Sequence, residues 1–103
     1  MSSEIEANIE KPICTWAEED GWEVRKLKYV ARNGAPDRMF FGHGRVVFIE
    51  FKRPGKKAKD HRSTLQKREG ERMLAAGIEY YMINSLAEGI KVLGLKKRAA
   101  ATH

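Results

Sequence analysis

Cysteine and histidine are scarce in this chain, and their scarcity excludes several kinds of site. The sequence contains one cysteine, Cys14, and three scattered histidines, His43, His61 and His103. One cysteine cannot form an internal disulfide, and its apolar helical surroundings favour a buried thiol in a reducing compartment. So few thiols and imidazoles argue against a zinc cluster and against a Cys-His or Ser-His-Asp nucleophile.

Long apolar runs are also missing. No stretch approaches the roughly 18–20 apolar residues of a membrane span, and the N-terminus lacks the basic and then apolar layout of a signal peptide. We therefore expect a cytoplasmic protein that does not bind membranes. The length of 103 residues, with 42% hydrophobic and 33% charged residues, predicts a single domain at 1–95 and a basic flexible tail at 96–103.

Charge is positive overall and unevenly placed. The formal net charge is +6, yet acids dominate the first twenty residues and the basic excess lies within 53–72. A local basic stretch beside an acidic pocket suits a phosphodiester substrate, because cations can hold flanking phosphates while acids hold a metal.

Hydrophobic periodicity predicts an α/β protein with the order αβββαβα and a small mixed β-sheet flanked by helices. Pro12 leaves open whether the first helix begins near Asn8 or begins earlier and kinks. Ser63 and Gln66 fit a capping box at the start of the second helix. A change of phase near Lys26 predicts a bulge in the first strand. The expected elements are a helix at 4–20, strands at 22–30, 36–41 and 46–52, a helix at 63–76, a strand at 78–84 and a last helix capped by Ser85.

The predicted hairpin brings two acids and a lysine together. If its turn has two loop residues, Gly42 pairs with Arg45. Counting back along both strands from that pair puts Asp37 opposite Glu50, with their Cβ atoms about 4.5–5.5 Å apart. Lys52 lies two residues beyond Glu50 and therefore on the same face of the sheet.

This trio favours a metal site. Two facing carboxylates are destabilising unless a cation neutralises them, and Mg²⁺ is typically held by one or two carboxylates with water and substrate phosphate. The two strands are apolar on both faces, a pattern typical of buried strands, in which charges are costly unless paired or bound to metal. Lys52 could then orient the attacking water or offset charge on the phosphate. The alternative is that Asp37, Glu50 and Lys52 are solvated charges on an exposed face of the sheet.

Further candidates lie on both sides of the hairpin. Glu6 and Glu10 are one helical turn apart and could reach the acid pair, or they could be solvent-facing acids near a helix N-terminus. The basic connector at 53–62 is either a solvated loop or a clamp on the phosphate backbone. The candidate DNA contacts are Arg38, Arg53, Lys56, Lys57, Lys59 and Arg62.

An ordered set of motifs resembles the VRR-NUC (virus-type replication-repair nuclease) family of the PD-(D/E)XK nuclease superfamily. The resemblance covers about residues 4 to 93. The bare P-D…E-x-K signature is weak, whereas G-x-P-D-R with a downstream Ser-x-x-Gln is fairly specific. The motifs are Gly34-x-Pro36-Asp37-Arg38, Glu50-x-Lys52, Ser63-x-x-Gln66 and Leu74-x-x-Gly77.

The resemblance implies a restriction-endonuclease-like core and a Mg²⁺- or Mn²⁺-dependent DNA endonuclease. It also implies a glutamate from the N-terminal helix, and the spacing favours Glu6 over Glu10. The other implied site residues are the metal ligands Asp37, Glu50 and the carbonyl of Phe51, the catalytic lysine Lys52, and Gln66 as a supporting residue on the helix.

Stand-alone members of this size look like viral enzymes that act on branched DNA, including four-way (Holliday) junctions, as homodimers. We therefore expect a phage or other viral protein acting in the host cell. A junction offers two equivalent strands, and a two-fold dimer supplies two equivalent sites. The alternatives are a non-catalytic basic nucleic-acid-binding module, and a nuclease for plain duplex or single-stranded DNA.

Overall fold

The computed structural model describes residues 7–52 and 63–96. The connector at 53–62 and the tail beyond Lys96 therefore lie outside the described residues, as does Glu6. The elements are α1 (Ala7–Glu19), β1 (Glu23–Lys26), β2 (Arg38–Gly42), β3 (Arg45–Phe51), α2 (Thr64–Ala75), β4 (Glu79–Ile83) and α3 (Leu86–Leu93). Their order confirms the αβββαβα prediction. No helix among these residues is long and apolar enough to cross a membrane.

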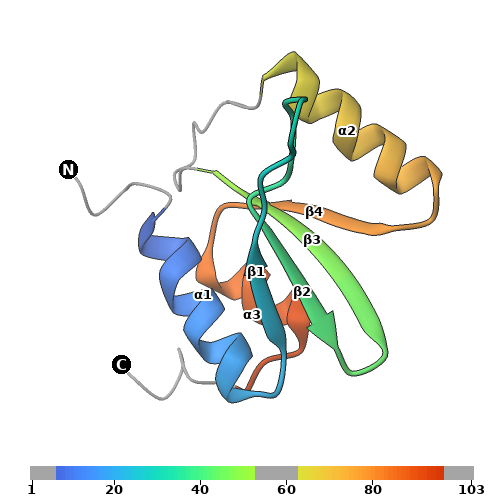
Figure 1. The fold of residues 1–103 in the computed structure, drawn as a ribbon. Helices are drawn as coiled ribbons and strands as arrows, with labels where there is room; N and C mark the ends of the chain where they lie inside the picture. Colours follow the sequence, from blue (N-terminus) through green and yellow to red (C-terminus); the bar gives the residue numbers. More distant parts are fainter. Residues whose placement is uncertain (1–6, 53–62, 97–103) are drawn as a thin grey trace.

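The four strands form one mixed sheet in the order β1-β2-β3-β4 (Figure 1). The pairs β1–β2 and β2–β3 are antiparallel, whereas β3 and β4 are parallel. The parallel pair follows from the connection, because α2 carries the chain across the sheet between β3 and β4. The predicted mixed sheet is therefore confirmed.

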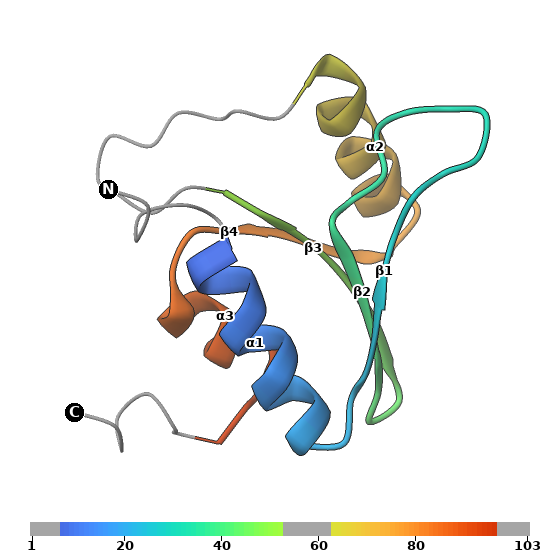
Figure 2. The ribbon, with the colours of Figure 1, turned by 60° about the vertical axis from the view of Figure 1, so that its left-hand side comes forward.

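Helices cover both faces of the sheet. Figure 2 shows α1 and α3 together on one face and α2 on the other. The main core lies between the sheet and the α1–α3 pair, because α1 presents its apolar stripe there despite the proline within it. The strands contribute the alternate residues of the same face. The buried core residues are Ile9, Ile13, Ala17, Trp22, Phe40, Val47, Ile49, Phe51, Ile83, Leu93 and Leu95.

The hairpin turn has the predicted two residues. His43 and Gly44 both have positive φ, 52° and 74°, which is the type I′ geometry that matches the twist of antiparallel strands. Gly42 pairs with Arg45, as expected.

The prediction of a strand over 22–30 is wrong beyond Lys26. The chain leaves the sheet there and returns only at Arg38, so residues 27–37 form a long loop in place of a bulged strand. Val30, which the prediction placed in this strand, does not line a sheet face, since it is 91% exposed. The change of phase in the sequence marked the exit of the chain from the sheet.

Helix α2 packs closely on β4, and this contact depends on a glycine. A Cβ atom on Gly70 would lie 2.6 Å from the ring of the buried Tyr80. We expect Gly70→Ala to lower the free energy of unfolding by about 1–3 kcal/mol, the usual cost of overpacking, despite the better helix propensity of alanine. Urea denaturation measures the difference. A variant as stable as the wild type would contradict the close approach of α2 to the sheet.

Candidate active site

The candidate site lies at one end of the β2–β3 ladder. The paired residues run from Gly42–Arg45 to Arg38–Ile49, so Asp37 and Glu50 occupy the next positions of the same register. Asp37 lies just before β2. Its carbonyl accepts a hydrogen bond from the Leu27 amide at 3.2 Å, which continues the pairing of β1 with β2 by one residue. The structure thus brings Asp37 beside Glu50, at the point where the ladder ends.

The carboxylate of Asp37 takes the place of a strand carbonyl. The Phe51 amide donates to Asp37 Oδ2 at 2.8 Å, which supplies that amide with the acceptor that a longer β2 would have offered. A hydrogen bond from a backbone amide to an ionised carboxylate is stronger than one between neutral groups. Asp37 is therefore fixed against the peptide that joins Glu50 to Phe51.

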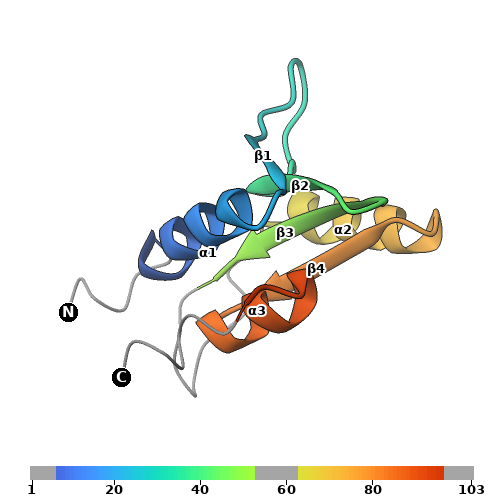
Figure 3. The same ribbon diagram turned by 90° about the horizontal axis from the view of Figure 1, so that it is seen from below.

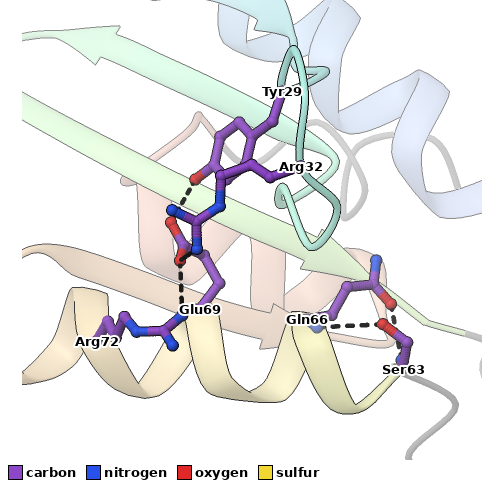
Figure 4. A network of polar contacts seen from close by, with 6 residues as sticks. All are labelled: Tyr29, Arg32, Ser63, Gln66, Glu69 and Arg72. Carbon is purple, nitrogen blue, oxygen red and sulfur yellow. Dashed lines mark hydrogen bonds and ion pairs between the residues drawn. The ribbon is translucent and has the colours of Figure 1, made fainter.

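Glu50 is a buried acid held by α2. It is 6% exposed, and Gln66 Nε2 donates to its Oε2 at 2.9 Å. Gln66 is in turn oriented by Ser63, whose amide donates to Gln66 Oε1 at 2.9 Å, while the Gln66 amide donates to Ser63 Oγ at 3.1 Å (Figure 4). The capping box is confirmed, and it directs the side-chain NH₂ group of Gln66 toward Glu50.

Lys52 follows the last residue of β3 and is half-buried. Its amide donates to the carbonyl of Ile83 at 2.9 Å, which continues the main-chain pairing of β3 with β4 by one residue. Extended backbone from Glu50 to Lys52 directs both side chains to the same side of the sheet. That side is the one covered by α2, because Gln66 of α2 contacts Glu50.

Glu10 and Arg38 bind each other on the other side of the sheet. Arg38 Nε donates to Glu10 Oε2 at 2.6 Å, and both side chains are largely buried. Arg38 pairs with Ile49, a core residue on the α1 side, whereas Glu50 faces α2. Strand alternation therefore separates the Glu10–Arg38 pair from the Glu50 carboxylate.

The donors in the described site fit a hard divalent cation. Within residues 7–52 and 63–96, no cluster of three or more His, Cys, Asp or Glu side chains could hold a metal ion. Two carboxylates, Asp37 and Glu50, and the main-chain carbonyl of Phe51 remain as oxygen donors. One or two carboxylates, completed by water and phosphate, is the usual protein contribution to a Mg²⁺ site. Burial makes the charge of Glu50 costly, and a bound cation would offset that cost in addition to the hydrogen bond from Gln66.

A second polar network, which no local sequence pattern predicts, connects loop 27–37 to α2. Tyr29 OH donates to Glu69 Oε2 at 2.6 Å, and Arg32 and Arg72 lie 3.7 and 3.4 Å from Glu69 Oε1 (Figure 4). Tyr29 and Glu69 are far apart in the sequence, so no local pattern predicts their contact. The network ties the loop that ends at Asp37 to the helix that carries Gln66.

The Tyr29–Glu69 contact shifts the pKa of both groups. Burial and the contact with Glu69 raise the pKa of Tyr29 to about 12, and the hydrogen bond from Tyr29 lowers the pKa of Glu69. The stabilisation from the tyrosine is present below its usual pKa near 10 and is lost as pH rises through about 12. The stabilisation from Glu69 is present above the usual carboxyl pKa and is lost as pH falls through its lowered value.

We expect Tyr29→Phe to remove one tyrosine that ionises near pH 12. The same change should destabilise the fold by about 1 kcal/mol, since it removes one hydrogen bond to a charged acceptor at a partly exposed site. Alkaline absorbance titration and urea denaturation measure the two effects. A titration curve that keeps the same late transition after the substitution would show that Tyr29 does not bind Glu69.

Cys14 is half-buried and packs beside the core, so it is less buried than the sequence predicted. Burial raises the pKa of Cys14 to about 11, so little thiolate forms near neutral pH. The thiol lines a surface pocket of about 370 Å³ together with Glu10, Lys11, Thr15, Lys26 and Arg38. Nothing in this arrangement makes Cys14 a nucleophile.

Among known proteins, a similarity to this chain is found in a solved structure. No protein-family model and no curated protein matches the chain. A solved structure described as "VRR_NUC domain" is similar to it, with 30% sequence identity and a TM-score of 0.74. The similarity covers 86% of this chain and 94% of that one, so it concerns nearly the complete domain.

Proposed function

The chain belongs to the VRR-NUC domain family, and on that premise we propose that it is a Mg²⁺- or Mn²⁺-dependent DNA endonuclease. We propose branched DNA, such as four-way junctions, as its substrate. The observation that carries the proposal is the buried Glu50 carboxylate, fixed by Gln66 beside an Asp37 carboxylate that is itself fixed by the Phe51 amide. Carboxylates oriented in this way by hydrogen bonds are typical of metal ligands rather than of solvated surface acids.

Asp37, Glu50 and the carbonyl of Phe51 would hold the ion in this proposal. When bound, the ion supplies Lewis-acid polarisation of a phosphoryl oxygen. We also propose Glu6 as the glutamate contributed by the N-terminal helix, because Glu10 is already bound to Arg38.

Lys52 has the catalytic role in the proposed reaction. Water attacks phosphorus in line with the leaving oxygen; it loses a proton, and the broken P–O bond leaves an oxygen that gains one. The ammonium group of Lys52 offsets the charge that grows on the phosphate and orients the water. Gln66 acts through Glu50, since it holds one carboxylate oxygen in place, and is therefore a positioning residue.

DNA contacts in the proposal come from Arg38 and from the basic residues that follow Lys52 in the sequence. The net charge of +6 favours binding that weakens steeply with salt. Arg38 binds Glu10 through Nε, so a phosphate contact would use its Nη groups. The other proposed contacts are Arg53, Lys56, Lys57, Lys59 and Arg62.

A homodimer completes the proposal. A four-way junction offers two equivalent strands, and a two-fold dimer places two sites at a fixed separation. The phage or other viral origin and the cytoplasmic location remain predictions that follow from the resemblance to small stand-alone members of the family.

The test is cleavage of end-labelled junction, flap, duplex and single-stranded DNA with Mg²⁺, Mn²⁺ or EDTA. We expect metal-dependent cleavage with the junction as the preferred substrate. Equal cleavage of all four would keep the nuclease and remove the preference for branched DNA. Binding without cleavage in either metal would instead favour a non-catalytic binding module.

A further inference from the structure

The loop at 27–37 presents an apolar tip between two cations. Val30 is the most exposed large apolar side chain among the described residues, at 91%. Lys28 and Arg32 lie on either side of it and are also exposed, with 58% of the Arg32 side chain accessible. Figure 3 shows the loop projecting beyond the sheet and the helices.

The tip is held in one conformation. Tyr29 and Arg32, which bracket Val30 and Ala31, both contact Glu69 of α2, and the Arg32 guanidinium lies 5.9 Å from the centre of the Tyr29 ring. Ala31 has a φ of 67°, a conformation that alanine seldom adopts and that persists only where the surroundings impose it. The exposed valine is therefore presented by a preformed structure.

The base of the loop rests directly on the helix. A Cβ atom on Gly34 would lie 2.8 Å from the carbonyl oxygen of Leu65, so only glycine allows this approach of the two backbones. Three residues later the loop ends at Asp37, and Leu65 is next to Gln66. The loop that carries the tip therefore contacts the helix that carries Gln66, and it ends at Asp37.

We propose that Val30 is a wedge that packs against an open base step of branched DNA, while Lys28 and Arg32 contact the phosphates beside it. This inference rests on the proposed function. Single exposed apolar residues are common on proteins, but a fixed apolar tip between two cations is complementary to an unstacked base flanked by phosphates. A second copy of this tip is a poorer partner, because its cations would face cations.

The experiment compares Val30→Ala with Val46→Ala in the wild-type background. Val46 is the matched control. It is 48% exposed and lies near the start of β3, whereas Lys52 follows the end of that strand. Binding is measured in Ca²⁺ to a junction with 2-aminopurine at the branch point and to plain duplex. We expect Val30→Ala to reduce the preference for junction over duplex about tenfold, the scale of losing two buried methyl groups from the contact, and to remove most of the rise in 2-aminopurine fluorescence. Val46→Ala should match the wild type in both.

Three other results would overturn the wedge. If the wild type cleaves DNA with metal but Val30→Ala keeps the junction preference and the fluorescence rise, the wedge is wrong and the nuclease stands. If the wild type neither binds nor cleaves any of the DNAs, the proposed function fails and the wedge fails with it. If sedimentation shows that Val30→Ala changes the oligomeric state, the tip is a self-association surface.

Discussion

Lys52→Ala is expected to lower the single-turnover rate of junction cleavage by about 10²–10³-fold, the loss typical for one preorganised group that stabilises transition-state charge. The reason lies in its placement. Lys52 is half-buried directly after β3, and extended backbone puts its side chain on the same side of the sheet as the Glu50 carboxylate. Single-turnover kinetics with enzyme in excess separate this chemical effect from weaker DNA binding.

Lys91→Ala is the matched control for Lys52→Ala. Lys91 is exposed on α3, the helix on the opposite face of the sheet from Gln66. It loses the same charge and should leave the cleavage rate unchanged. Lys52→Arg should not restore activity, since a planar guanidinium does not replace a compact ammonium group. If Lys52→Ala cleaves as fast as the wild type, Lys52 has no catalytic role.

Glu50→Gln is expected to raise the Tm of the metal-free protein and to abolish its stabilisation by Mn²⁺. Glu50 is buried beside a second carboxylate, so removing its charge relieves both desolvation and repulsion. Gln66 can still donate to the new amide oxygen. For the wild type, metal at 100 times its Kd should stabilise the fold by about 2.7 kcal/mol, which corresponds to a rise in Tm of roughly 11–22 °C for a domain of this size.

Thermal unfolding of the wild type and the variant, with Mn²⁺ and with EDTA, measures this effect. Glu71→Gln is the control, because it makes the same chemical change at an exposed position of α2. Its metal-induced shift should equal that of the wild type. A Glu50→Gln protein that Mn²⁺ stabilises as strongly as the wild type would remove Glu50 from the proposed ligands.

The sequence was most informative where structure is local or periodic. The two-residue turn fixed the register of the hairpin, and that register placed Asp37 next to Glu50. The capping box of Ser63 and Gln66 was readable because both residues lie within one helical turn. The second role of Gln66, its hydrogen bond to Glu50, depends on how α2 packs on the sheet. The motif resemblance pointed to it, but helix capping alone would not.

Long-range contacts were much harder to predict. Val30 and Tyr29 resemble strand residues in type, yet Tyr29 turns to Glu69 on α2 and Val30 faces solvent. Tertiary contacts outweighed their strand propensity. The Glu10–Arg38 pair could likewise not be predicted from local sequence patterns, since it joins α1 to β2. These contacts depend on the packing of helices against the sheet, which periodicity does not specify.

The central claim is that Asp37 and Glu50 together hold a divalent cation. Electron paramagnetic resonance of Mn²⁺ tests it directly, because the signal of the free ion falls as the ion binds. We predict saturable binding by the wild type, displaced by Mg²⁺, with affinity reduced at least about tenfold in Asp37→Asn, as expected when one carboxylate ligand is lost. Glu71→Gln should bind like the wild type. Unchanged Mn²⁺ affinity in Asp37→Asn and Glu50→Gln would show that these two carboxylates do not hold the ion.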